Sequence, residues 1–407
     1  MPATCDIPKL NTRIEMKRRQ FLSLSGSMVS ALGFSSLTAC STKPARILDT
    51  DKVIIGGYSH TDEKGKRLNQ YGVLAIQVVD EHKHSSDNYQ IICDFNVPDE
   101  VHLATLYPDG KSILVCSRKP SASLLKYSLE GELIAELKTQ RNQHFEGHCI
   151  FSHDEKFIYV TASNFQQIAA DKQGRILTLN SSDLSLVSDH SSGGIGPHEL
   201  VWQSESLIAI ANTGVITHPD SGRKILNIDN IQSNVALYHT ANHTLAYQWT
   251  VPVLSLSARH LDRMQDGTLI IGCQYKKQDK RPPCIAFAKI DKSLFFAETN
   301  NDTFHWQMQG YTASIKAIPY SNKALITNPR GHIISQWKYS ITDETEKQLL
   351  KEESIEFNKG LKLSEDGKKA WISQGAGELR VWNTQSEQVD SLRIKLKANI
   401  WWANHLG

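Results

Sequence analysis

GGIGPHELVWQSESLIAIAN, residues 193–212, is the stretch of the chain that decides the fold. A turn rich in glycine and proline comes first and delivers His198 to the start of a short strand. A polar turn follows, and then a second strand, residues 207–212, that is almost entirely apolar. A strand, a tight turn and a second strand are typical of an antiparallel meander.

The same order of strand, turn and strand recurs along the chain. Three further copies carry an Asp-Gly turn, at residues 108–110, 265–267 and 365–367. Aligned on their first strands, successive copies are 45 to 62 residues apart. Repeats of this length with about four strands each are typical of a β-propeller. Six copies and an N-terminal pair of strands predict an all-β, seven-bladed β-propeller over residues 51–407.

The predicted ring closes through its two ends. We expect a C-terminal strand, residues 398–402, to pair with the N-terminal strands, which removes the free sheet edges. Periodicity alone does not establish closure, so a sandwich or two stacked barrels is the alternative. Four tryptophans near the C-terminus are expected to pack between blades, namely Trp371, Trp382, Trp401 and Trp402.

The N-terminal residues have the features of an export signal. Arg18 and Arg19 precede an apolar run diluted by serine and glycine, as in a twin-arginine signal. The run ends in Leu-Thr-Ala-Cys, which resembles a lipobox and predicts lipidation of Cys40; an ordinary signal-peptidase site is the alternative. We therefore expect a signal over residues 1–40, a linker over 41–50, and a periplasmic lipoprotein anchored preferentially to the outer membrane.

Charge and cysteine count describe the exported part. Removing residues 1–39 takes away five basic and two acidic residues, so the formal net charge falls from +2 to −1. A near-neutral surface argues against a nucleic-acid partner, whose binding depends on basic contacts to phosphate. Five cysteines remain, so at least one thiol is free in an oxidising compartment. Cys273 and Cys284 either form a disulfide or stay buried thiols.

Several motifs together resemble one bacterial family. Besides the twin-arginine signal they are Glu146-Gly147-His148, Gly196-Pro197-His198-Glu199-Leu200, Thr217-His218-Pro219-Asp220-Ser221-Gly222-Arg223, Arg259-His260-Leu261, Gly272-Cys273-Gln274 and Ser373-Gln374-Gly375. The family is called domain of unknown function 1513, and the resemblance covers residues 50–407. It implies a seven-bladed propeller of the YVTN or WD40 type. It also implies an envelope partner, either imelysin-like or an iron-transport component, but no catalytic residues.

Four histidines recur at the beginning of the first strand of successive copies, namely His102, His148, His198 and His260. The first strand of a propeller blade is innermost, so its ends rim the central channel. Imidazoles converging there are a candidate site for a transition metal or haem iron, with Glu146 or Glu199 as a ligand or hydrogen-bond partner. In the alternative, each histidine hydrogen-bonds within its own blade and the rings do not point at each other.

The polar loop after the second strand of the opening stretch is another candidate site. His218, Asp220 and Arg223 lie in a loop fixed by proline and glycine, and Arg223 is suited to clamp a carboxylate or phosphate. Arg259 and Arg330 add positive groups at comparable blade positions, which would attract an anion to the channel mouth. The alternative is a local turn with Arg223 paired nearby.

Familiar catalytic motifs do not occur in the sequence. It lacks Cys-x-x-Cys-His, Gly-x-Ser-x-Gly, His-Glu-x-x-His, a Walker phosphate loop and a dinucleotide fingerprint. We therefore predict a binding or docking module and assign no catalytic residue; the resemblance to the family implies that this module is linked to an envelope iron-uptake system. The alternatives are a metal- or cofactor-dependent enzyme of the oxidoreductase type that uses the channel histidines, and a purely structural scaffold.

Overall fold

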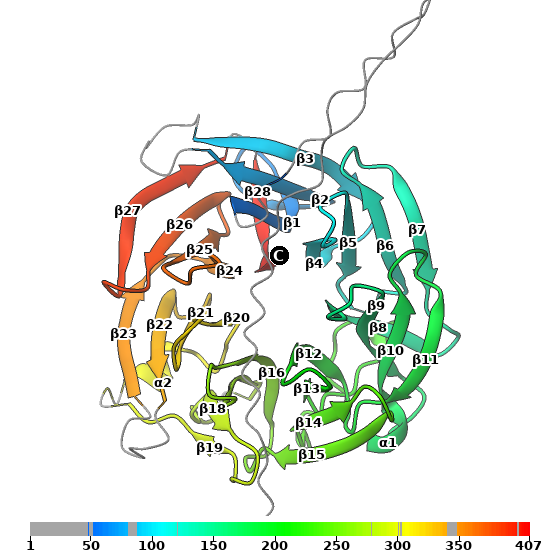
Figure 1. Ribbon diagram of the computed structural model, residues 1–407. Helices are drawn as coiled ribbons and strands as arrows, with labels where there is room; N and C mark the ends of the chain where they lie inside the picture. Colours follow the sequence, from blue (N-terminus) through cyan, green and yellow to red (C-terminus); the bar gives the residue numbers. More distant parts are fainter. Residues whose placement is uncertain are drawn as a thin grey trace, which may run out of the picture. The chain divides into compact units, whose positions relative to one another are not determined.

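Seven sheets of four antiparallel strands stand in a ring around a central channel in the computed structural model of this chain (Figure 1). The seven-bladed propeller predicted from the repeats is therefore confirmed, and the sandwich and stacked-barrel alternatives are wrong. The structure describes residues 48, 52–79, 88–119, 121–277, 279–299, 301, 303–339, 348–396 and 399–407. The export residues Arg18 and Arg19, the lipidation site Cys40 and nearly all of the linker lie outside these residues, so those assignments stay predictions.

Each blade runs from an innermost strand at the channel to an outermost strand at the rim. The first three blades, from inside outward, are β28 (Ile400–Leu406), β1 (Val53–Thr61), β2 (Arg67–Val78) and β3 (Tyr89–Val97); β4 (Val101–Leu106), β5 (Ser112–Ser117), β6 (Ser123–Ser128) and β7 (Leu133–Lys138); and β8 (Gln143–Phe151), β9 (Phe157–Asn164), β10 (Gly174–Asn180) and β11 (Leu186–Ser191). The next two are β12 (Pro197–Trp202), β13 (Leu207–Asn212), β14 (Asn234–His239) and β15 (Thr244–Thr250); and β16 (Leu256–Arg263), β17 (Leu269–Tyr275), β18 (Ile285–Ala288) and β19 (Phe295–Phe296). The last two are β20 (Ser314–Ala317), β21 (Lys323–Asn328), β22 (Ile333–Lys338) and β23 (Gln348–Ser354); and β24 (Asn358–Leu363), β25 (Lys369–Gln374), β26 (Glu378–Asn383) and β27 (Gln388–Lys395).

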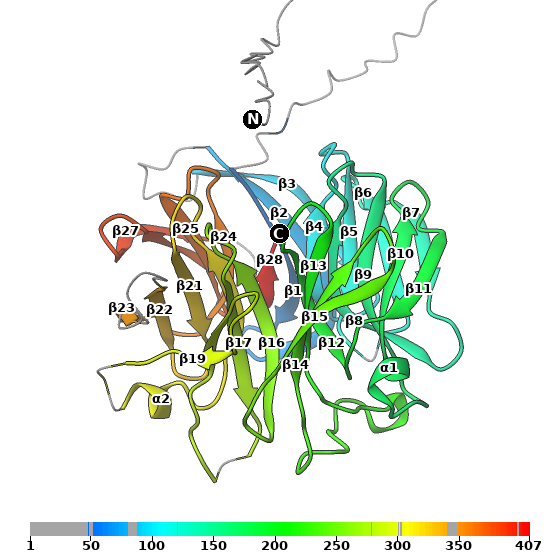
Figure 2. The same ribbon diagram turned by 60° about the horizontal axis from the view of Figure 1, so that its bottom comes forward.

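Two helical turns accompany the sheets, α1 (Ala170–Gln173) and α2 (Phe304–Gln307), and both lie toward the lower edge of the ring in Figure 2. A short 3-10 turn, η2, spans Pro219–Ser221. None of the helices among the described residues has the length and apolar character needed to cross a bilayer.

The ring closes because the two ends of the chain share one sheet. Strand β28 is the innermost strand of the blade that also contains β1, and Trp402 in β28 pairs with Tyr58 in β1. Closure by a C-terminal strand is thus confirmed, but the strand spans Ile400–Leu406 instead of residues 398–402. The shift toward the C-terminus brings the last residues of the chain to the channel.

Large aromatic side chains fill the spaces between blades, as expected for the four tryptophans; Trp401, the most exposed of them, packs against Phe357 at the start of the last blade with ring centroids 5.4 Å apart. Trp382 is fully buried, and its Nε1 donates a hydrogen bond of 2.9 Å to Gln336 Oε1 in the preceding blade. Trp371 and Trp402 belong to one apolar cluster that joins the last blade to the first. Trp401 is only partly buried and borders a surface hollow.

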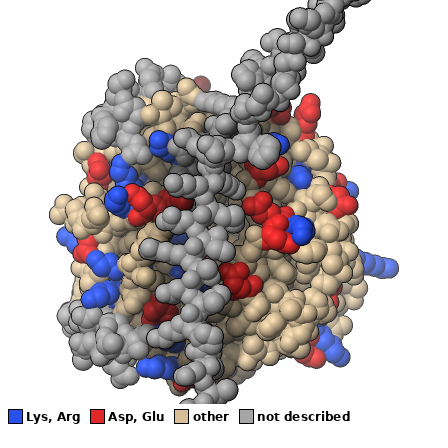
Figure 3. All heavy atoms as spheres, viewed as in Figure 1, with Lys and Arg blue, Asp and Glu red and all other residues tan. Residues whose placement is uncertain are grey.

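The five cysteines of the described region are all buried, free thiols. Cys273 donates its backbone N–H to the carbonyl oxygen of Cys284 at 2.7 Å, so these two lie side by side without a disulfide. Of the two alternatives for this pair, a disulfide or buried free thiols, the structure has the free thiols. On the face drawn in Figure 3, basic and acidic side chains are interspersed, which fits a near-neutral surface.

Candidate metal-binding layer in the channel

The innermost strands share a β-bulge at the level of the histidines. His102 is the extra residue of the bulge in β4. Register shifts occur at the histidines of four other innermost strands, namely His148 in β8, His198 in β12, His260 in β16 and His405 in β28. A bulge bends its strand and re-aims the local side chains. One repeated backbone irregularity thus directs a histidine into the channel from each of five consecutive blades.

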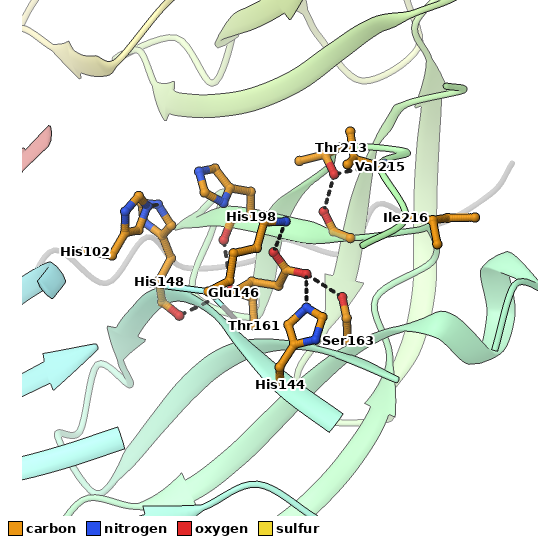
Figure 4. Close-up of polar contacts among 12 residues, drawn as sticks. His102, His144, Glu146, His148, Thr161, Ser163, His198, Thr213, Val215 and Ile216 are labelled. Carbon is orange, nitrogen blue, oxygen red and sulfur yellow. Dashed lines mark hydrogen bonds and ion pairs between the residues drawn. The ribbon is translucent and has the colours of Figure 1, made fainter. Parts of the chain in front are cut away.

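The five histidines meet in one buried layer across the channel, and Figure 4 shows three of them from the side. Eight pairs of their rings have centroids 4.5 to 5.9 Å apart. The Nε2 atoms of His102 and His148 are 2.9 Å apart. The rings therefore face each other across blade boundaries, and the interpretation as separate intrablade hydrogen bonds is wrong for these residues.

Burial favours the neutral form of four of these imidazoles. It lowers the pKa of His148 to about 4, with the nearby His260 acting in the same direction. Burial, followed by repulsion from His148, also lowers the pKa of His102, His198 and His405 well below the usual value. A neutral imidazole carries the nitrogen lone pair that binds a metal, so these four residues have their ligand-competent form at neutral pH.

Ligand atoms in this layer form three groups suited to a metal ion. Within each group they lie within 4.8 Å of one another; the groups are His102 with His148 and His405, His148 with His198 and His260, and Glu199 with His260 and His405. Nitrogens bound about 2 Å from one ion lie roughly 3–4 Å apart, so small side-chain rotations suffice. His198 Nδ1 and His405 Nε2 are buried without a hydrogen-bond partner among the described atoms. Unsatisfied lone pairs of this kind fit a transition-metal site.

Glu199 holds one of these histidines in place. Its Oε2 lies 3.0 Å from His260 Nδ1 and also accepts the backbone N–H of Leu261 at 3.2 Å. Burial raises the pKa of Glu199, but the hydrogen bond with His260 and the positive charges nearby, including Lys316, together outweigh burial, and the net pKa is lowered. A carboxylate bound to one imidazole nitrogen leaves the other nitrogen free for a metal. Glu199 thus fits the partner role expected from the sequence.

Glu146 has a different role from the one considered for it. Its Oε2 is 2.7 Å from Lys119 Nζ, and its Oε1 accepts from the hydroxyl of Ser163 at 2.6 Å and lies 3.1 Å from His144 Nε2 (Figure 4). Burial raises the pKa of Glu146, but Lys119 and His144 outweigh it and hold the pKa well below its usual range. Glu146 is therefore a saturated buried carboxylate, outside the three candidate ligand groups.

Two small features let the histidines approach closely. Gly147 has a φ of 100°, and a Cβ there would stand 2.6 Å from Cδ2 of His102. The hydroxyl of Thr161 lies 2.9 Å from the carbonyl oxygen of His198 and 3.3 Å from that of His148 (Figure 4). A missing side chain and a bridging hydroxyl thus fix the spacing of neighbouring innermost strands.

The histidine layer lies between two cavities. One has a volume of about 400 Å³ and reaches His102, His198 and His260. The other has a volume of about 510 Å³ and reaches His148 and His405. A metal ion in the layer would therefore be accessible to a ligand from either cavity.

The loop residues predicted as a ligand site are only partly brought to the channel. Arg223 and Arg259 line the 400 Å³ cavity together with Arg330. His218 and Asp220 do not line it; they lie 3.4 Å apart, and the Asp220 side chain is 89% exposed. Arg223 pairs with Glu100 of another blade at 3.5 Å and not locally.

The expectation that Arg259 and Arg330 occupy comparable blade positions is wrong. Arg259 is the extra residue of the bulge in the innermost strand β16, whereas Arg330 follows the second strand, β21. Both nevertheless reach the same cavity, because loops after second strands and bulges of innermost strands face the same end of the channel.

His405 was not found by sequence reasoning. It lies two residues from the C-terminus, in the strand that was expected to end at residue 402. The available signal was the closing strand itself: once that strand is the innermost strand of a blade, a histidine in it can reach the channel, as His102 does from β4.

The fold and the layer define a seven-bladed β-propeller with a histidine-lined channel. The chain belongs to the family described as "Protein of unknown function (DUF1513)", whose model matches residues 95–407. This confirms the family resemblance of the sequence motifs. No curated protein matches the chain.

Among solved structures, the chain is similar to a functionally unknown protein from Desulfotomaculum acetoxidans, with a TM-score of 0.53 and 11% sequence identity. The similarity covers 86% of this chain and 99% of that one. At this identity the similarity concerns the fold alone.

Proposed function

We propose that this protein is a metal-binding module whose channel histidines hold a divalent first-row transition-metal ion. One observation carries the proposal: five buried imidazoles from five blades converge in one layer, with ligand groups within 4.8 Å. Imidazole suits zinc, copper, iron and nickel. With three protein ligands, the number in each candidate group, the ion would keep an open position toward a cavity, as in sites that exchange ligands.

Metal analysis of the exported, untagged protein tests this proposal. We expect about one ion per chain, and we expect the double variant His148→Ala with His198→Ala to lose it. The matched control is His190→Ala with His243→Ala, because these two histidines also stack on each other, with centroids 4.1 Å apart, but belong to none of the candidate groups. A protein that stays metal-free after incubation with these ions, and whose melting temperature ignores them, would refute the proposal.

The cellular setting that we propose comes from the sequence: export through the twin-arginine route, lipidation at Cys40, and service in an envelope iron-uptake system. Replacing Arg18 and Arg19 by lysine should keep the protein in the cytoplasm. Cys40→Ala should release it from the membrane in soluble form. If neither change alters the location of the protein, the proposed export and membrane anchoring are wrong.

The proposed partner is an imelysin-like or iron-transport component of the envelope, as the family resemblance suggests. A pull-down from envelope extracts with the lipidated protein should recover such a component. Two results would contradict the partnership: recovery of such a component in equal amount from a control pull-down without this protein as bait, or recovery of neither class of protein. Neither result would bear on the proposed metal site.

A further inference from the structure

The 400 Å³ cavity on one side of the histidine layer has an unusual excess of positive charge. Its lining among the described residues contains seven lysines and arginines but a single carboxylate, Glu146. Both the walls and the mouth carry these cations. The volume lies in the range of typical small-molecule sites, about 300–1,000 Å³.

The repeated architecture concentrates these cations. Five of them follow the second strand of a blade, namely Arg118 and Lys119 after β5, Arg223 after β13, Lys276 after β17 and Arg330 after β21. The other two lie in bulges of innermost strands, Arg259 in β16 and Lys359 in β24. Equivalent places in the blades face the same end of the channel, so cations far apart in the sequence reach one cavity.

Only three of the seven cations have a carboxylate partner among the described residues. Lys119 pairs with Glu146 at 2.7 Å, and the other oxygen of Glu146 is engaged by Ser163 and His144. Arg118 and Arg223 share Glu100, which lies outside the cavity lining, at 2.8 and 3.5 Å.

The other four cations are held by neutral groups or by none. Lys276 donates to Gln274 Oε1 at 2.7 Å, Arg330 lies over the ring of Tyr311 at 4.6 Å, and Lys359 reaches Asn404 Oδ1 at 3.4 Å. Arg259 is 91% buried. Its Nε has no hydrogen-bond partner among the described atoms. A buried guanidinium without an anionic partner is costly, because charge separated from water needs a counter-charge.

The cations also repel one another. Burial, followed by repulsion from Arg259 and Arg330, lowers the pKa of Lys276 to about 6. Burial, together with Arg67 and Arg118, lowers the pKa of Lys359 to about 8. An anion in the cavity would relieve both effects, since an opposite charge within about 4–6 Å favours the charged form.

We propose that this cavity binds a compact polyanion, a small molecule with two or more carboxylate or phosphate groups. Arginine offers planar pairs of N–H donors that match either group. A monoanion would leave most of the four unpaired cations without a counter-charge, whereas a dianion or trianion can contact several of them. The cavity floor is formed by His102, His198 and His260, so the ligand would lie directly over the histidine layer. Binding of the polyanion does not depend on a metal in that layer.

Calorimetric titration of the chelator-treated, exported protein with citrate and with pyrophosphate tests the proposal. We expect at least one of the two to bind more than tenfold more tightly than acetate, and added salt to weaken binding. Tighter binding of citrate assigns the site to polycarboxylates, and tighter binding of pyrophosphate assigns it to phosphorylated ligands.

Lys276→Gln combined with Arg330→Gln should lower the affinity at least tenfold. Arg330 is exposed and Lys276 partly so, and the melting temperature of this variant checks its fold. The matched control is Lys111→Gln with Lys156→Gln, which removes the same charge from exposed turns at the opposite end of two blades and should change affinity less than twofold.

The variant His148→Ala with His405→Ala changes two histidines of the layer that do not line this cavity, so it should still bind the polyanion, which separates this proposal from the metal site. Absence of measurable binding of both anions at millimolar concentration would overturn the proposal. Equal affinity for acetate, or an equal loss in the cavity and control variants, would overturn it as well.

Discussion

The histidine layer and the cationic cavity above it are neighbours in one channel, yet they have opposite chemistry. The layer is largely neutral, because burial lowers the pKa of His148 to about 4 and also lowers the pKa of His102, His198 and His405. The cavity carries arginines that stay charged even when buried, such as Arg259. The comparison shows how one repeated scaffold separates ligands for a cation from ligands for an anion.

The difference follows in part from the backbone positions involved. Register shifts in five innermost strands place the histidines in the buried layer, where burial favours a neutral imidazole, although the bulges of β16 and β24 also contribute the cations Arg259 and Lys359. Loops after the second strands end at the cavity mouth, where solvent reduces the cost of a charge. A free metal cation approaching through this mouth would be repelled, whereas an anionic complex of the metal would be attracted.

The largest expected effect concerns acid stability and tests whether the layer is neutral. The folded pKa of His148 lies below the unfolded value of about 6.5. The unfolded chain therefore takes up a proton that the folded chain does not, and stability falls as the pH falls from about 6.5 toward 4, while it is flat above 6.5. For His148 alone this amounts to roughly 3 kcal/mol.

Denaturant unfolding of the chelator-treated protein between pH 4 and pH 8 measures this dependence. His148→Gln should make it clearly shallower, because glutamine does not titrate. His153→Gln, which changes a histidine with a 44% exposed side chain, should leave it unaltered. If the free energy of unfolding depends on pH in both variants as it does in the parent protein, His148 is not held neutral by burial, and the contrast between the layer and the cavity fails.

The next effect concerns the backbone that brings the histidines together. Gly147→Ala places a methyl group against His102 and forces a positive φ of 100° on a residue with a side chain. We expect a loss of roughly 2 kcal/mol in the free energy of unfolding. Gly110→Ala shares the positive φ but meets nothing within 4 Å, so the difference between the two variants isolates the contact with His102. Equal losses in the free energy of unfolding of the two variants would show that His102 can move away from an added methyl group without cost.

The third effect distinguishes the roles of two buried carboxylates, Glu199 and Glu146. Glu199→Gln removes the charge that orients His260, and we expect metal affinity to fall about 10–100-fold. Glu146→Gln changes a carboxylate bound to Lys119 and not to the layer, so it should lower stability but change metal affinity less than about threefold. Competition with a chromogenic chelator measures both. An equal loss in metal affinity would mean that the layer extends to Glu146.

The sequence predicted the propeller because its turn chemistry repeats: glycine and aspartate stand at the same place in several blades. It also predicted four of the five channel histidines, since each lies in the first strand of a repeat, although His148 and His260 stand in the middle of β8 and β16 and not at the start as expected. It could not show that the rings converge, because convergence depends on bulges that leave no periodic signal. His405 was hidden for a different reason, as its blade is completed by a strand from the other end of the chain.

The cationic cavity was visible in the sequence only in fragments. Arg223 and Arg259 were predicted, and both line it. Lys276 stands in a lysine-rich segment typical of a solvated hairpin tip, and only the fold turns it toward the channel. The cations of the buried part of the cavity come from different blades. A single sequence does not reveal that such isolated charges meet, because this depends on how the blades are arranged.

The smallest effect that we predict concerns the pH dependence of polyanion binding. Lys276 is faced by Arg118, Lys119, Arg259 and Arg330, and by the neutral groups of Gln274 and Tyr311. With a pKa of about 6 in the free cavity, it is largely uncharged at pH 8. A bound polyanion raises this pKa, so the affinity should increase as the pH falls through the raised value and level off below pH 6.

Methanedisulfonate is a suitable probe for this effect, because its two sulfonates stay ionised throughout the range. Its affinity should be several-fold to about tenfold higher at pH 5.5 than at pH 8, since one further cation is a modest addition to six others. Lys276→Gln should remove most of this dependence, whereas Lys111→Gln should not. An affinity that is independent of pH in the parent protein would mean that Lys276 is already charged in the free cavity. The boundary between the neutral layer and the charged mouth would then lie deeper in the channel than Lys276.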